Sequence, residues 1–182
     1  MVEAPPSFNA KAFREALGLF ATGVTVVTTT TATGDRLGTT ASSFNSVSLN
    51  PPLVLFSLAR NAKSFDAWLQ AKSYAVNILS EEQDHISNRF ARALTDKWSK
   101  VECESGPTTN QPLFPDALAS FECVTYANYD GGDHLIMVGC VVSTQRRQSQ
   151  GRPLIFYGSR YRTLENEINT IFRNADIWMH GW

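Results

Sequence analysis

The chain has 182 residues, of which 43% are hydrophobic and 18% are charged. A chain of this length folds as one domain and buries enough apolar surface to need no disulfide or metal. Its 16 basic and 17 acidic residues give a net charge of −1, which gives no support to nucleic acid or an anionic membrane as a partner. The apolar runs are shorter than a membrane span and the N-terminus lacks a signal-peptide pattern, so we expect a cytoplasmic protein.

The cysteines and the common motifs narrow the kinds of site further. Cys103, Cys123 and Cys140 are odd in number and form no CxxC pair, so we expect neither a disulfide framework nor a zinc site. Cys123 and Cys140 fall in strand-like runs, where cysteine acts as a small hydrophobic residue. The sequence has no HExxH, Walker A, GxGxxG or GxSxG motif. No metal is therefore expected, and the commonest enzyme signatures are missing.

The first third of the chain predicts an arm, a helix and strands. Residues 1–8 are expected to form a flexible arm, because two consecutive prolines disfavour regular structure. Asn9 can cap a helix that ends before Gly23 and carries one apolar face, formed by Phe13, Ala16, Leu17 and Phe20. The β-branched run 24–31 predicts a strand, and we interpret its threonines 28–31 as a half-exposed face. A turn at 32–35 and an extended segment over 36–46 follow, and the Asn-Pro-Pro of 50–52 ends that segment.

The rest of the chain predicts strands joined by hairpins and short helices. Strands are expected over 53–58, 74–79, 119–129, 134–146 and 154–157, with helices over 61–71 and 81–93 and an irregular stretch over 95–118. Asp-Gly-Gly-Asp at 130–133 is a hairpin signal between the two longest strands. Residues 9–163 would form the domain, and 164–182 a helical tail capped by Thr163. Without a regular βαβ alternation, the pattern favours a mainly β fold, an antiparallel barrel with peripheral helices.

Small and hydroxyl-bearing residues are concentrated between Gly38 and Pro52. Small side chains let a planar ligand approach the backbone, and Ser and Thr hydroxyls can bind a phosphate or the polar edge of a heterocycle. The alternative is an ordinary Ser/Thr-rich edge strand. The Asn-Ala-Lys-Ser of 61–64 opens a predicted helix, where free N–H groups and Lys63 could bind an anion. The alternative there is a helix cap beside a solvated lysine.

Three further segments carry residues that could contact a ligand. Arg89 and Phe90 lie on a predicted helix, and Arg89 could pair with a phosphate or simply face water. His134 follows Gly-Asp at the start of a strand and could orient a cofactor or transfer a proton, or merely close the turn. Tyr157 begins an aromatic and arginine cluster that could stack on a flat ligand or simply close the barrel.

Taken in order, these segments resemble the flavin reductase-like family, and more narrowly the reductase component of two-component flavin-dependent monooxygenases. The matching segments are 20–28, 39–44, 47–54, Lys63-Ser64, Arg89-Phe90-Ala91, Gly132-Asp133-His134, Val138-Gly139 and 152–157. The resemblance covers roughly residues 12–163. Residues 92–98 depart from the family's pattern, so no contact is assigned to them.

The resemblance implies an antiparallel Greek-key split β-barrel of the FMN-binding type, assembled as a homodimer. It implies hydride transfer from NADH or NADPH to FAD or FMN, with the reduced flavin passing to a separate oxygenase that hydroxylates an aromatic such as a phenol or chlorophenol. His134 would lie on the nicotinamide side as the catalytic residue. The flavin contacts that it implies are Thr39, Thr40, Ala41, Ser42, Ser43, Asn50, Pro51, Ser57, Lys63, Ser64, Arg89, Phe90, Ala91 and Tyr157.

Two other functions stay open from the sequence. One is a flavin-binding protein of the same fold that does not oxidise nicotinamide. The other is an oxidase similar to pyridoxamine-phosphate oxidase, with tightly bound FMN and a small amine substrate. The first would hold flavin tightly and turn over no nicotinamide, and the second would consume its amine without added nicotinamide.

Overall fold

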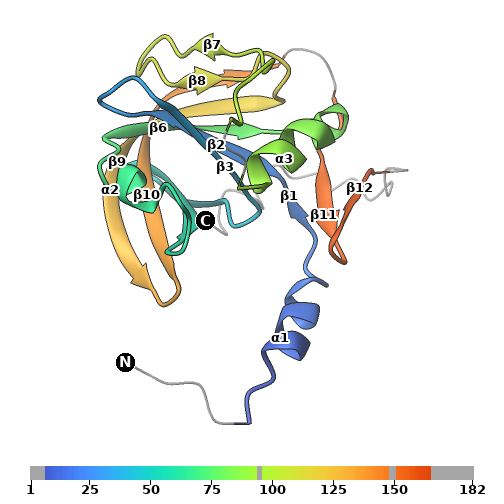
Figure 1. Cartoon of the computed structure of the whole chain (residues 1–182). Coiled ribbons are helices and arrows are strands. Elements are labelled where there is room, and N and C mark those ends of the chain that lie inside the picture. The colour runs from blue at the N-terminus through green and yellow to red at the C-terminus, as the bar shows by residue number, and fades with distance from the viewer. Residues whose placement is uncertain (1–6, 94–95, 148–150, 165–182) are drawn as a thin grey trace.

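A computed structural model describes residues 7–93, 96–147 and 151–164 (Figure 1). The predicted C-terminal helix and most of the N-terminal arm lie outside these residues, so both stay predictions. No helix of the described chain is long and apolar enough to cross a membrane.

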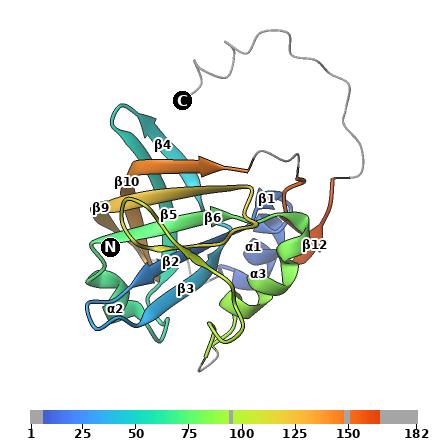
Figure 2. The ribbon, with the colours of Figure 1, turned by 90° about the horizontal axis from the view of Figure 1, so that it is seen from above.

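A seven-stranded antiparallel sheet forms the body of the protein and confirms the predicted fold class. Its order is β3-β2-β6-β9-β10-β5-β4. The strand bounds are β2 Thr25–Thr30, β3 Arg36–Ala41, β4 Asn45–Leu49, β5 Pro52–Ala59, β6 Ser73–Ile78, β9 Ala119–Gly131 and β10 His134–Arg146. The sheet curls (Figures 1 and 2), but the edge strands β3 and β4 do not pair in the described chain. An open barrel of this kind is a split barrel.

The first half of the threonine run is buried, which corrects the prediction of a half-exposed face for Thr28 and Thr29, whereas Thr30 and Thr31 are half-buried. Thr28 and Thr29 are almost fully buried. The Thr28 hydroxyl donates to the carbonyl of Pro112 at 2.5 Å, and the Thr29 hydroxyl donates to that of Ser73 at 2.8 Å. Because each buried hydroxyl has an acceptor, the desolvation cost of burying it is offset.

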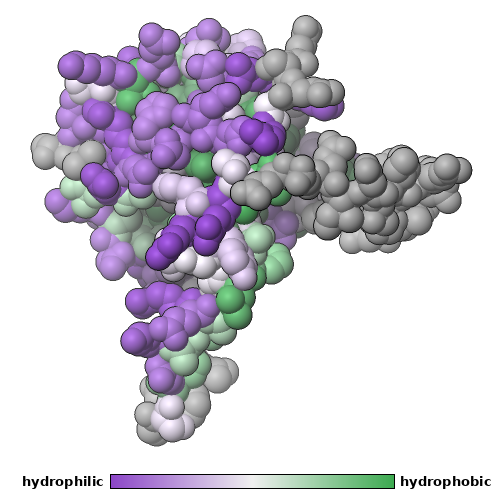
Figure 3. Space-filling view, turned by 90° about the vertical axis from the view of Figure 1, so that its right-hand side faces the viewer, coloured by the Kyte–Doolittle hydropathy of each residue, from purple (hydrophilic) through white to green (hydrophobic). Residues whose placement is uncertain are grey.

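The N-terminal helix is capped as predicted but ends earlier. In α1 (Ala10–Leu17), the side-chain carbonyl of Asn9 accepts from the N–H groups of Lys11 and Ala12, both at 3.1 Å. Gly18 is the C-cap, whereas Gly23 lies in β1 (Thr22–Gly23), so the predicted stop at Gly23 is wrong. None of the helix residues is buried, and the helix extends away from the barrel with its apolar side uncovered (Figures 1 and 3).

The other helices are shorter than predicted. Residues 61–71 form only the five-residue α2 (Phe65–Leu69), and 81–93 form a 3-10 turn, η1 (Glu81–Gln83), followed by α3 (Asp84–Ala91). A capping box between Ser80 and Gln83 starts η1. Two small sheets complete the fold. They are β1-β11-β12, with β11 Ile155–Tyr157 and β12 Arg160–Arg162, and β7-β8, with β7 Glu104–Ser105 and β8 Pro112–Leu113.

Two apolar clusters hold the elements together. One fills the barrel around Phe56, Trp68 and Tyr74, whose rings meet edge to face at 5.8 and 5.3 Å between centroids. The other lies under α3 and includes Phe90 and Phe114. Cys123 is buried in the first cluster, and burial raises the pKa of its thiol to about 12, so it packs as the predicted small hydrophobic residue.

Candidate functional site

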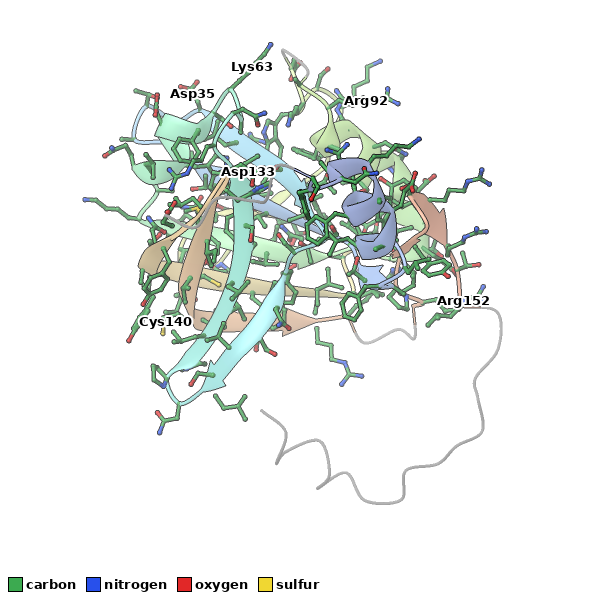
Figure 4. The ribbon with its side chains drawn as sticks, turned by 90° about the horizontal axis from the view of Figure 1, so that it is seen from below. Asp35, Lys63, Arg92, Asp133, Cys140 and Arg152 are labelled. Atoms are coloured by element: carbon green, nitrogen blue, oxygen red, sulfur yellow. The ribbon has the colours of Figure 1, made fainter. Side chains whose placement is uncertain are left out.

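A cavity of about 580 Å³ opens between β3, the segment after β5 and the C-terminal end of α3. Its walls contain many small side chains. Its lining comprises Asp35, Arg36, Leu37, Gly38, Thr39, Leu58, Ala59, Ala62, Lys63, Ser64, Phe90, Ala91, Arg92, Ala93, Asp96, Lys97 and Trp98. Asp35, Lys63 and Arg92 lie toward the same end of the barrel in Figure 4.

The cavity brings together five of the predicted site residues from three separate segments of the chain. They are Thr39 of β3, Lys63 and Ser64 before α2, and Phe90 and Ala91 at the end of α3. Segments that are distant in sequence thus meet at one surface.

A glycine lets α3 approach β3 at the floor of this cavity. A Cβ on Gly38 would lie 2.5 Å from Cδ1 and Cε1 of the Phe90 ring. The Thr40 hydroxyl joins the same two elements by donating to the carbonyl of Ser87 at 2.7 Å. Figure 2 shows α3 beside β3. Any larger residue at position 38 would push the two elements apart.

The cavity carries a positive charge excess. Arg36, Lys63, Arg92 and Lys97 line it, against Asp35 and Asp96. Asp96 is turned toward the backbone, since its Oδ1 accepts from the N–H groups at 98 and 99, both at 2.9 Å. Charges of one sign in a concave site favour a ligand of opposite charge, so this cavity suits an anionic group.

An aromatic and arginine pair forms one wall. The Arg36 guanidinium carbon lies 5.7 Å from the ring centroid of Trp98, and Trp98 meets Phe90 edge to face at 4.9 Å. Arg36 also donates from Nη1 to the Cys103 sulfur at 3.1 Å. The sequence predicts no ligand contact for Arg36, Trp98 or Cys103. Residues 92–98 depart from the family pattern, and the sequence indicates only that Arg36 belongs to an extended segment.

The other small and hydroxyl residues lie along the strands beside the cavity. Thr40 and Ala41 lie on β3, and Ser42 follows its end. The Ser43 hydroxyl accepts from the Ser57 N–H at 2.9 Å, which joins the end of β3 to β5. None of these five residues lines the cavity, so their flavin contacts stay predictions.

Four predicted ligand residues lie elsewhere. Asn50 and Pro51 form the turn between β4 and β5, and their peptide bond is cis. Tyr157 ends β11 in the small sheet. Arg89 donates from Nε to the Lys97 carbonyl at 2.6 Å, so its guanidinium holds the 96–97 segment. A ligand contact by any of them stays a prediction, and for Arg89 the structure shows a loop contact instead.

His134 lies next to the cavity rather than in its wall. It begins β10 and pairs with Ala59, a lining residue of β5. Its Nδ1 lies 2.7 Å from Oδ1 of Asp133, and this hydrogen bond, together with the charge of His134, lowers the pKa of Asp133 below its ordinary value. With Nδ1 engaged, Nε2 is the ring nitrogen left for a ligand.

Arg60 fixes the hairpin turn that carries this histidine. Its backbone N–H donates to the Asp133 carbonyl and its Nε to the Gly132 carbonyl, both at 2.9 Å, and its Nη2 pairs with Asp130 at 2.5 Å. Gly132 has a φ of +75°, which glycine adopts without strain. The sequence pattern had given Arg60 no role, because its contacts join residues about seventy positions apart.

Comparison with known proteins identifies the family. Residues 17–165 match the family model described as "Flavin reductase like domain", and the chain belongs to this family. The resemblance found in the sequence is therefore confirmed.

Several named proteins are similar to the chain. It is 43% identical over 160 residues to FMN reductase (NADH) SmoA of Agrobacterium fabrum, covering 86% of this chain and 87% of that protein. It is 44% identical over 166 residues to the reductase component of a flavin-dependent trigonelline monooxygenase of Acinetobacter baylyi, covering 91% of this chain and 53% of that protein. The structure of the NADH:FAD oxidoreductase SgcE6 of Streptomyces globisporus with NAD and FAD fragments matches with a TM-score of 0.84 at 32% identity, covering 92% of this chain and 100% of that one.

Some relatives are much longer than this chain. It spans 46% of the length of a Rhizobium meliloti protein named "Probable flavin reductase", which is 42% identical over 144 residues covering 79% of this chain.

Proposed function

We propose that this chain is an NAD(P)H:flavin oxidoreductase that reduces FAD or FMN and supplies the reduced flavin to a separate monooxygenase. The observation that carries the proposal is the positively charged, small-residue-lined cavity in a chain of the flavin reductase-like family. Similar proteins carry the names FMN reductase (NADH) and NADH:FAD oxidoreductase, which supports this nicotinamide and flavin pairing.

The cavity residues fit a flavin. Gly38, Ala59 and Ala62 line it with little side-chain bulk, which suits the approach of a flat ring. Lys63 and Arg92 supply charge for the phosphate end. Because α2 has only five residues and Ser64 makes no side-chain cap, the side-chain charge of Lys63 replaces the predicted helix dipole as the reason for phosphate binding here.

A bound flavin supplies the hydride acceptor, and the protein contributes orientation. We assign the nicotinamide side to His134. Two observations support this assignment: its strand pairs it with Ala59, a lining residue of the cavity, and its Nδ1 contact with Asp133 leaves Nε2 for a ligand. Asp133 holds the ring through Nδ1, and Arg60 holds the turn. Hydride transfer needs the two rings at roughly 3–3.5 Å, so a fixed turn at this edge would limit misalignment.

Partners follow from the family and from the exposed surface. Similar proteins include reductase subunits of flavin-dependent monooxygenases, which supports a separate oxygenase here, and an aromatic such as a phenol or chlorophenol is the substrate proposed for it. The homodimer is the assembly that the family resemblance implies. Its support here is that Val47, Leu49, Tyr126 and Val142 of β4, β9 and β10 are exposed, and a subunit interface would remove their apolar surface from water. A cytoplasmic location stays a prediction.

Nicotinamide oxidation by the purified chain tests the proposal. NADH and NADPH are each offered with no flavin, with FMN and with FAD. We expect oxidation that depends on added flavin. Bound flavin without oxidation would leave a flavin-binding protein, and amine oxidation without nicotinamide would indicate an oxidase.

Two histidine variants test the role of His134 separately. His134→Ala is expected to slow nicotinamide oxidation while flavin affinity is retained, and His85→Ala, an exposed histidine of α3, is the matched control. Equal rates in the two variants would remove His134 from the mechanism.

A further inference from the structure

Lys97 is held in a defined position at the floor of the cavity. Its Nζ donates to the carbonyl of Phe90 at 2.8 Å and to that of Gly38 at 3.2 Å. The segment that carries it is fixed from both sides, by Arg89 on the Lys97 carbonyl and by Asp96 on the N–H groups at 98 and 99. A lysine side chain is normally flexible, so these contacts preorganise its ammonium group.

The contacts of Lys97 leave its charge uncompensated. Phe90 lies in the last turn of α3, where a cation is favourable, which accounts for one of the two carbonyl contacts. No carboxylate pairs with Lys97 in the described parts of the chain, although burial lowers the pKa of its ammonium. An ammonium has three donors, and two are used. One N–H of this half-buried ammonium therefore remains for a ligand in the cavity.

Besides Arg36, which contacts Trp98 and Cys103, two other cations line the same cavity as Lys97. Lys63 comes from the segment before α2 and Arg92 from the end of α3. Both are exposed, and neither makes a side-chain hydrogen bond or ion pair within the described residues. Together with Lys97 they bring positive charge into the cavity lining from three segments of the chain.

We propose that Lys97 is a phosphate-binding residue, which acts with Lys63 and Arg92 so that the cavity selects phosphorylated flavins over riboflavin. The inference rests on the proposed function, since it takes the cavity as the flavin site. A phosphate monoester carries between one and two negative charges near neutral pH, and charge-assisted hydrogen bonds are the strong ones. The third N–H of Lys97 supplies such a bond.

Flavin affinity measured with and without the phosphate tests the inference. Dissociation constants for FMN and riboflavin are measured by fluorescence titration of the full chain, for wild type and for Lys97→Met. We expect Lys97→Met to weaken FMN binding by about tenfold or more and to change riboflavin binding by less than about twofold. Lys72→Met, an exposed lysine outside this cavity, is the control and should change neither value.

The ratio of the two affinities separates phosphate binding from a merely structural role. If Lys97→Met lowers FMN and riboflavin affinity equally, Lys97 only supports the floor and the inference is overturned. Lys97→Arg, which keeps a cation, should recover part of the FMN preference. Thermal unfolding of each variant shows whether the fold is kept.

Wild-type binding separates the inference from the proposed function. If wild type binds none of FMN, FAD and riboflavin, the proposed function fails. If it reduces FMN and riboflavin and binds the two equally well, the reductase stands and the phosphate inference falls. A Lys63→Met/Lys97→Met double variant should be non-additive for FMN and additive for riboflavin, because only a shared phosphate couples the two residues.

Discussion

Gly38→Ala is expected to destabilise the fold and to disturb the cavity floor. The added Cβ would lie 2.5 Å from two atoms of the Phe90 ring and 3.4 Å from Cζ2 of Trp98. Carbon atoms in contact prefer about 3.5–4.0 Å, so ring and strand must separate by roughly 1 Å. Phe90 is fully buried and is also packed against Phe114 at 5.6 Å, which leaves it little room to move.

The size of the effect follows from overpacking. Extra carbon in a packed core typically costs about 1–3 kcal/mol, and we expect a loss in this range for Gly38→Ala. Moving Phe90 also moves its carbonyl, which accepts from Lys97, so FMN affinity should fall as well. Gly23→Ala is the matched control, since a Cβ there meets no atom within 4 Å.

Urea unfolding followed by tryptophan fluorescence, with an FMN titration of each variant, measures both consequences. A smaller ring should relieve the clash, so Gly38→Ala should cost about 1 kcal/mol less in a Phe90→Leu background. A loss below about 0.5 kcal/mol with unchanged FMN affinity would refute the close approach of α3 and β3 as the reason for this glycine.

Three further predictions follow from individual contacts. Glu122→Gln should lower the free energy of unfolding, measured in urea, by about 1–3 kcal/mol. The buried Glu122 carboxylate accepts from the N–H groups of residues 108 and 109 and from the hydroxyl of Thr109. In the glutamine variant, the side-chain NH2 would face these donors and one hydrogen bond would be lost. Arg60→Met should slow nicotinamide oxidation in steady-state assays without weakening FMN binding, since Arg60 holds the turn before His134. Burial lowers the pKa of Lys97 from 10.5, so the unfolded chain binds more protons between the two values and stability rises with pH there. The FMN preference over riboflavin, measured from neutral to alkaline pH, should decline across the lowered pKa.

The architecture was predictable because its signals are local. Alternating and β-branched runs define strands, and the Asp-Gly-Gly-Asp between β9 and β10 places their hairpin correctly. The buried threonines of β2 were not predictable, because the acceptor of Thr28 is the carbonyl of Pro112, far along the chain. The predicted helix ends were wrong for a similar reason. The extent of α2 depends on packing of Trp68 in the barrel rather than on the helix propensity of the segment.

The residues of the candidate site also fall into those that the sequence predicts and those that only the structure reveals. Thr39, Lys63 and Phe90 could be named from motifs, since the residue types themselves suggest contact with a phosphate or a ring. Lys97 and Arg60 could not, because a lysine or arginine in a sequence is usually a solvated charge. What distinguishes them is the set of carbonyls around each head group, and only the folded chain brings those carbonyls together.

The charges of the cavity also bear on release of the flavin. A dissociable flavin needs enough attraction to bind and few enough enclosing contacts to leave. Lys63 and Arg92 are exposed at the rim, where their attraction is screened by solvent, whereas Lys97 is half-buried and fixed. The rim cations therefore draw an anionic ligand in from solution, and the floor cation determines which flavins are retained. On a chain whose net charge is only −1, this local arrangement rather than overall charge directs the ligand to the cavity.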